Sequence, residues 1–98
     1  MKVIWSPLAI DRAVEQAHVI AQDKPGAAAR WLDGLFDAAE RLADLPKLGR
    51  MVPELKKEDH RELSYGRYRI IYRIDAKQIS VLTVRHSRRL LDRAEIDG

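Results

Sequence analysis

The sequence contains no cysteine among its 98 residues. Disulfide bonds, cysteine-ligated zinc sites and thiol nucleophiles are therefore excluded, and the composition fits a reducing compartment. No apolar run approaches the ~20 residues of a membrane-spanning helix. The first residues also lack the long apolar stretch of a secretory signal peptide. We therefore expect a cytoplasmic protein that makes no membrane contact.

The common catalytic and cofactor-binding motifs are missing as well. The chain has neither a GxGxxG pattern nor a phosphate-binding P-loop, and its serines lie outside any nucleophile-elbow context. His18, His60 and His86 are far apart and lack the spacing of metal ligands. We expect no cofactor and no metal.

The positive charge is unevenly distributed along what we expect to be a single domain, residues 1–98. Residues 1–59 hold nine Lys or Arg and ten Asp or Glu, whereas residues 60–93 hold nine Lys or Arg and three Asp or Glu. Eight of those last nine cations are arginine, whose planar guanidinium matches phosphate and carboxylate groups. This distribution favours an anionic partner, and a simple solvated strand surface is the plainer alternative.

Hydrophobic periodicity predicts a strand and two helices in the first half. Residues 2–5 form a short apolar strand candidate. Apolar residues then recur at helical spacing over 7–22, after Ser6, which suits an N-cap. A second amphipathic pattern predicts a helix over about 25–45.

Three strands are predicted after a loop rich in proline and glycine, over about 60–65, 67–75 and 78–86. The last is apolar on both faces and should lie inside the sheet. The order is β-α-α-β-β-β. We predict an α+β fold in which two N-terminal helices pack on one face of a small, mainly antiparallel sheet.

The other face of this sheet is predicted to be open and basic. In the second of the three strands tyrosine and isoleucine alternate with arginine, so that Arg67, Arg69 and Arg73 share one side. Arg85 can join them from the adjacent strand. At ~3.3 Å per residue, Arg69 and Arg73 lie about 13 Å apart, which suits an extended acidic partner better than a small anion.

A metal-free RNA-cleaving site is one chemical interpretation of these residues. Such a reaction needs a base for the 2′-hydroxyl, an acid for the leaving oxygen and cations for the developing phosphorane charge. Glu54 is a candidate base and His86 a candidate acid, with Arg69 and Arg85 as the cations. The structural alternatives are a strand-end role for His86 and a loop anchor, or a partner for Arg50, for Glu54.

Six segments together resemble the RelE/ParE toxins of bacterial type II toxin–antitoxin systems. They are WSPLA from Trp5, LADLPKLGR ending at Arg50, VPEL at 52–55, HREL at 60–63, YGRYRIIYRI at 65–74 and VRHSRR at 84–89. The resemblance covers nearly the whole chain. It implies a growth-inhibiting toxin that a cognate antitoxin neutralises within a toxin–antitoxin hetero-oligomer.

The resemblance implies one of two activities. RelE-type members cut mRNA on the ribosome, whereas ParE-type members inhibit DNA gyrase and serve plasmid stabilisation. Ribonuclease members add a catalytic Tyr, His or several Lys near the C-terminal strand, and no Tyr follows residues 84–89 here. We therefore expect the ParE type, with a ribosome-dependent mRNA endoribonuclease as the alternative and a non-catalytic nucleic-acid-binding module as a further one. The expected target-binding residues are Arg61, Arg67, Arg69, Arg73, Arg85, Arg88 and Arg89.

Overall fold

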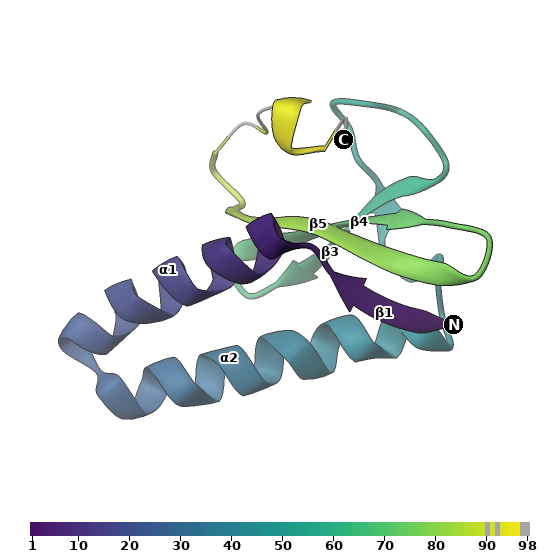
Figure 1. Ribbon diagram of the computed structural model, residues 1–98. Helices are drawn as coiled ribbons and strands as arrows, with labels where there is room; N and C mark the ends of the chain where they lie inside the picture. Colours follow the sequence, from purple (N-terminus) through teal and green to yellow (C-terminus); the bar gives the residue numbers. More distant parts are fainter. Residues whose placement is uncertain (90, 92, 97–98) are drawn as a thin grey trace.

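The computed structural model describes residues 1–89, 91 and 93–96. Two helices form a hairpin below a twisted sheet (Figure 1). The elements are β1 (Lys2–Trp5), α1 (Pro7–Asp23), α2 (Pro25–Glu40), the 3-10 turn η1 (Arg41–Ala43), β2 (Arg50–Met51), β3 (His60–Tyr65), β4 (Tyr68–Ile74), β5 (Gln78–His86) and the 3-10 turn η2 (Arg93–Glu95). The predicted α+β fold is confirmed.

The sheet has the strand order β1-β5-β4-β3-β2. β1 pairs in parallel with β5, and the other pairs are antiparallel. β5 is an interior strand, as its apolar faces predicted. The short β2 was not predicted, because two exposed residues carry no periodic signal. The second helix ends at Glu40 rather than 45, and η1 continues its last turn.

The first helix begins where its cap predicts. The Ser6 Oγ accepts a hydrogen bond from the Ala9 N–H at 3.0 Å and donates one to the Leu82 carbonyl at 3.0 Å. One hydroxyl therefore caps α1 and ties it to β5. Ala9 and Ala13 are fully buried, and these small side chains let the helix approach the sheet closely.

The main core lies between the helices and the sheet. Leu35 and Leu42 pack there against Ile70, Tyr72 and Ile79, all fully buried. The Tyr72 hydroxyl accepts a hydrogen bond from the Gly49 N–H at 2.9 Å and donates one to the Pro46 carbonyl at 2.7 Å. This buried tyrosine therefore fixes the turn that leads into β2.

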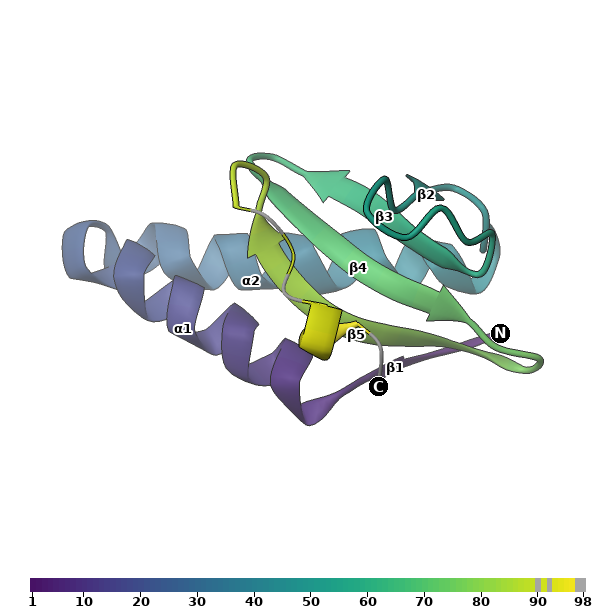
Figure 2. The same cartoon turned by 90° about the horizontal axis from the view of Figure 1, so that it is seen from above.

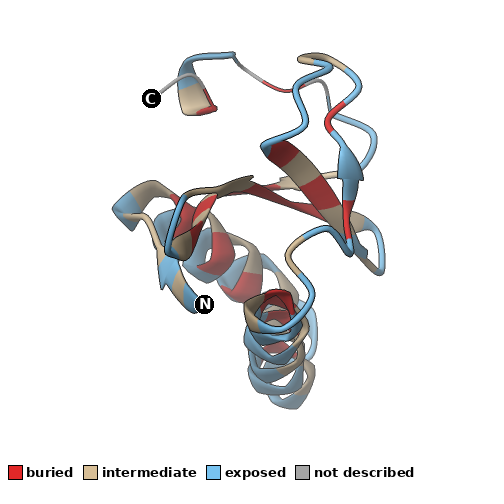
Figure 3. Cartoon of the chain, turned by 90° about the vertical axis from the view of Figure 1, so that its right-hand side faces the viewer, coloured by how far each residue is buried: buried red, intermediate tan, exposed pale blue. Residues whose placement is uncertain are grey.

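A second apolar cluster covers the opposite face of the sheet. Val52, Ile71 and Ile96 are fully buried in it, Leu91 is nearly so, and Leu55 and Leu82 flank them. Seen from above, the segment between β2 and β3 and the turn η2 lie over the strands (Figure 2). The side view places these segments on one side of the sheet and the helices on the other (Figure 3). The prediction that this face is open is therefore wrong.

A β-bulge shifts the pairing register of β4 and β5 between Ile71 and Tyr72, where the sheet separates these two clusters. Ile71 pairs with Thr83 and Tyr72 pairs with Val81, so that Leu82 is the additional residue of β5. Tyr72 remains in the main core, while Ile71 and Leu82 pack in the second cluster.

No helix in the described part of the chain has the length and apolar character needed to cross a membrane.

Candidate functional site

Arg69 is the best-satisfied cation on the covered face. Its guanidinium donates to both carboxylate oxygens of Glu54, at 3.1 and 2.9 Å, and to both of Glu62, at 3.1 and 2.7 Å. Arg69 is 7% exposed and Glu62 is 3% exposed. Arg50, at the edge of the sheet, donates a third hydrogen bond to Glu62, at 3.3 Å. This is the fifth bond of the group. These residues form a buried ion network.

This network changes the chemistry of Glu54. The hydrogen bonds from Arg69 hold the pKa of the Glu54 carboxyl below its ordinary value. A carboxylate that binds its proton so weakly is a poor general base. The Leu91 N–H also lies 3.4 Å from this carboxylate, so Glu54 acts as an anchor for the covering segments.

Two other arginines of the predicted open face, Arg73 and Arg85, also have partners within the chain. Arg69 and Arg85 are directly opposed on neighbouring strands, as the alternation predicted. Arg73, however, pairs with Asp75 at 2.7 Å, and Arg85 pairs with Glu95 at 2.7 Å. The arginine face was predicted wrongly because strand alternation does not show which carboxylates reach it: Asp75 from the following turn, and Glu54 and Glu95 from the covering segments.

Two of the expected target-binding arginines lie away from that face. Arg61 donates to the carbonyls of Glu58 and Gly49, at 2.9 Å each, and holds the turn before β2. Arg67 is exposed in the turn between β3 and β4, beside Gly66, whose φ of +55° favours glycine.

A groove between α1 and the end of β5 brings together four arginines, Arg12, Arg85, Arg88 and Arg89. It has a volume of about 590 Å³. Its lining mixes basic groups with apolar ones: Arg12, Glu15, Gln16, Val19, Tyr68, Val84, Arg85, His86, Arg88 and Arg89. Such a mixture can receive a partner that carries both carboxylate and apolar side chains.

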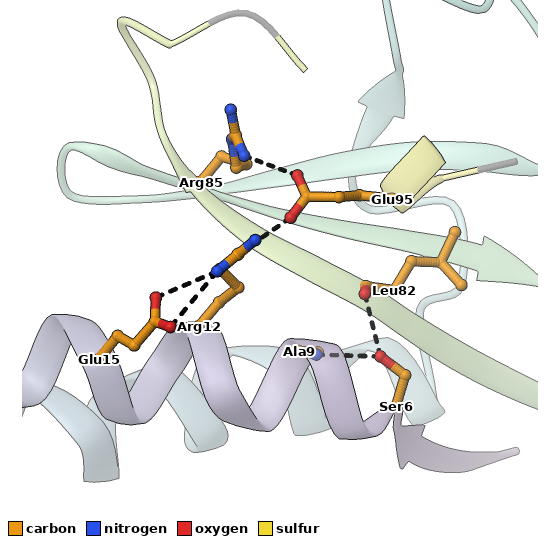
Figure 4. Close-up of polar contacts among 7 residues, drawn as sticks. All are labelled: Ser6, Ala9, Arg12, Glu15, Leu82, Arg85 and Glu95. Carbon is orange, nitrogen blue, oxygen red and sulfur yellow. Dashed lines mark hydrogen bonds and ion pairs between the residues drawn. The ribbon is translucent and has the colours of Figure 1, made fainter. Parts of the chain in front are cut away.

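Glu95 bridges the two walls of this groove (Figure 4). Its Oε1 accepts from Arg12 Nε at 2.9 Å, and its Oε2 accepts from Arg85 at 2.7 Å. The Glu95 hydrogen bond raises the pKa of Arg12, which also contacts Glu15. Neither Arg12 nor Glu95 was singled out from the sequence. The signal for Arg12 was its position on the same helical face as Gln16 and Val19.

His86 lies at the end of β5, where it closes the strand and lines the groove. Its ring packs edge-on against Tyr68, with ring centroids 5.4 Å apart. Its Nδ1 accepts from the Arg88 N–H at 3.2 Å, which fixes the following turn. The four residues proposed for RNA cleavage are thus divided. Arg85 and His86 line the groove, whereas Glu54 and Arg69 bind each other in the buried network.

The site offers no ready position for a metal ion. Across residues 1–89, 91 and 93–96, no group of three or more His, Asp or Glu side chains is arranged to hold one. The carboxylates described above already bind arginine. The arginines that line the groove offer electrostatic binding of an anionic group.

Two solved structures share this architecture. A chain from the chromosomal ParDE system of P. aeruginosa superimposes with a TM-score of 0.75 at 16% identity, covering 88% of this chain and 95% of its own. A chain of the RelBE2 toxin–antitoxin complex from Mycobacterium tuberculosis gives 0.53 at 20% identity, over 87% and 95%. No curated protein sequence matches significantly.

The family assignment comes from the sequence as a whole. The family model described as the ParE toxin of the type II toxin–antitoxin system parDE matches residues 3–91. That span includes both helices, the strands β2 to β5, all of β1 except Lys2, and the buried network. The chain therefore belongs to the ParE toxin family of type II toxin–antitoxin systems.

Proposed function

We propose that this toxin inhibits growth by binding DNA gyrase and that a cognate antitoxin neutralises it. The observation that carries the choice of target is that Arg69 is buried and bound to carboxylates of the same chain. RNA cleavage would need this cation to contact the phosphorane and Glu54 to accept a proton. Here four hydrogen bonds join Arg69 to Glu54 and Glu62, and breaking them would leave the buried carboxylate of Glu62, which is 3% exposed, without its main partner.

The groove supports a binding role instead. Arg88 and Arg89 are exposed beside it, and Tyr68 and Val84 supply apolar surface. A protein target with acidic and apolar groups matches both features. We propose Arg88 and Arg89 as the principal target contacts, with Arg85 supporting them from the groove wall.

An antitoxin partner is supported by the structural similarities and by exposed apolar side chains. The two similar structures come from a ParDE system and a RelBE2 toxin–antitoxin complex. On α1, Ile10 and Val14 are one turn apart and each at least 40% exposed, and Phe36 of α2 is 38% exposed. Exposed apolar groups at helical spacing are typical of a surface that a partner helix or strand covers. We propose a toxin–antitoxin hetero-oligomer that buries this surface.

A supercoiling assay with purified gyrase tests the proposal. The toxin should inhibit supercoiling, and Arg88→Ala/Arg89→Ala should weaken inhibition at least tenfold if the pair contributes about 1.4 kcal/mol or more. Arg30→Ala/Arg41→Ala removes two exposed arginines outside the groove and serves as the matched control. If both double variants inhibit equally, the groove is not the gyrase-binding surface. If the wild type does not inhibit supercoiling, gyrase is not the target.

The ribonuclease alternative is retained because Arg85 and His86 line the same groove. An arginine beside an imidazole can combine a phosphate-binding cation with a proton donor. Programmed ribosomes provide the test. Cleavage of mRNA in the A site that disappears in His86→Ala would overturn the gyrase proposal, and intact mRNA with inhibited gyrase would support it.

A further inference from the structure

The arginines of the groove fall into two electrostatic classes. The bridged arginines, Arg12 and Arg85, share the carboxylate of Glu95. The exposed arginines, Arg88 and Arg89, form no side-chain hydrogen bond or ion pair with any residue in the described ranges 1–89, 91 and 93–96. The groove therefore presents fewer available cations than its lining implies.

Glu95 is well placed to control that number. Its side chain is 7% exposed, and its two oxygens lie 2.9 and 2.7 Å from nitrogens of the bridged arginines. Charges that are partly removed from water interact more strongly than charges on the open surface. A single carboxylate therefore offsets charge on two cations that come from different elements, α1 and β5.

The two possible classes of partner respond differently to this offset. Affinity for nucleic acid depends on the number of phosphates that cations neutralise, so loss of available cations weakens it steeply. A protein segment also gains from apolar contacts, here with Val19, Tyr68 and Val84. Neutralising the bridged arginines therefore lowers the affinity for a polyanion more than the affinity for a protein segment.

We propose that Glu95 is a specificity-determining residue, which makes the groove select a protein segment with carboxylate and apolar side chains over nucleic acid. The inference rests on the proposed function, because it takes a protein as the natural occupant of the groove. The basic composition alone would favour nucleic acid as the partner, whereas Glu95, in the C-terminal segment, would disfavour it.

Fluorescence anisotropy with a short labelled single-stranded RNA tests the proposal on the full chain. Glu95→Gln keeps the shape of the side chain and removes its charge. For each phosphate gained, the log–log salt slope should become more negative by about 0.7. If the affinities converge near 1 M salt, this corresponds to about fivefold tighter binding at 0.1 M. Glu40→Gln, an exposed carboxylate outside the groove, changes the net charge equally and should give no such gain.

Further variants separate charge from packing. Glu95→Asp keeps the charge but shortens the side chain, so it should not show the full gain in RNA affinity. Arg85→Gln/Glu95→Gln should return the RNA affinity toward that of the wild type. Thermal unfolding checks that each variant is folded. If Glu95→Gln unfolds, Glu15→Gln removes a more exposed carboxylate of the same groove and should also tighten RNA binding, by a smaller factor.

Three results would overturn the proposal: a gain in Glu40→Gln equal to that in Glu95→Gln, a gain that survives the Arg85→Gln change, or no gain from either groove carboxylate. Because the measurement involves no gyrase, its outcome is independent of the supercoiling assay. A toxin that fails to inhibit gyrase but shows the Glu95 effect would refute only the proposed target.

Discussion

Replacing Arg69 with methionine tests whether this arginine is a structural residue or a ligand for phosphate. The substitution leaves Glu62, which is 3% exposed, with Arg50 as its remaining ion-pair partner at 3.3 Å. The Arg50 side chain is 72% exposed, so most of its charge is screened by water. The variant therefore buries a carboxylate with inadequate compensation.

The expected cost is large for a domain of this size. Removing one partner of a buried ion pair costs about 3–5 kcal/mol, against a total stability of about 5–15 kcal/mol. With a slope of about 2 kcal/mol per molar urea, the unfolding midpoint should fall by about 2 M. Circular dichroism during urea titration measures this directly. Glu54→Gln/Glu62→Leu/Arg69→Met removes the three inner members of the network and should recover much of the loss, because the charge that remains, on Arg50, is 72% exposed.

A small effect would refute the reasoning. If Arg69→Met costs less than about 1 kcal/mol, it behaves as a surface substitution. Arg69 would then be accessible in solution, and its role as a phosphate-binding cation would return together with the ribonuclease alternative. The stability measurement therefore bears on the target of the toxin without requiring either target.

Three further predictions concern the frame around the site. Ser6→Ala removes the cap hydrogen bond to the Ala9 N–H and should cost about 1–2 kcal/mol, measured by thermal unfolding. Gly49→Ala places a Cβ against the backbone of Glu62 and should cost about 1–3 kcal/mol or more in the same measurement. The pKa of Glu54 is lowered in the folded state, so its stabilising contribution is present above about pH 4.5 and is lost as the pH falls through the folded value. Urea midpoints between roughly pH 6 and 3 should show this loss, and Glu54→Gln should reduce it.

The helices and strands could be predicted because their signals are local. Ser6 precedes the first helical turn, and the alternation in β4 separates residues that face the helices from those that do not. The covering of the other face could not be predicted in the same way. The partners of Arg69 lie 7 and 15 residues away, and Glu95 reaches Arg12 across 83 residues.

One signal for the covered face was nevertheless present in the sequence. Val52 and Leu55 interrupt a polar loop, and Leu91 and Ile96 interrupt a charged C-terminal segment. Apolar residues in such segments need a surface on which to be buried, and the helix-covered face was already filled. Ile71 and Leu82 provide that surface, and the carboxylates carried by the same segments then reach the arginines.

The pairing of β1 with β5 has a consequence for how the chain reaches its native state. Lys2 lies opposite Gln78, and the Ser6 hydroxyl donates to Leu82, so contacts near the start of the chain span 76 residues. Pairings of such long range require the closure of a large loop and slow the search for the native topology. During synthesis, the α1–α2 hairpin emerges long before the strand on which it rests. We therefore expect the sheet to be completed late, once β5 has left the ribosome.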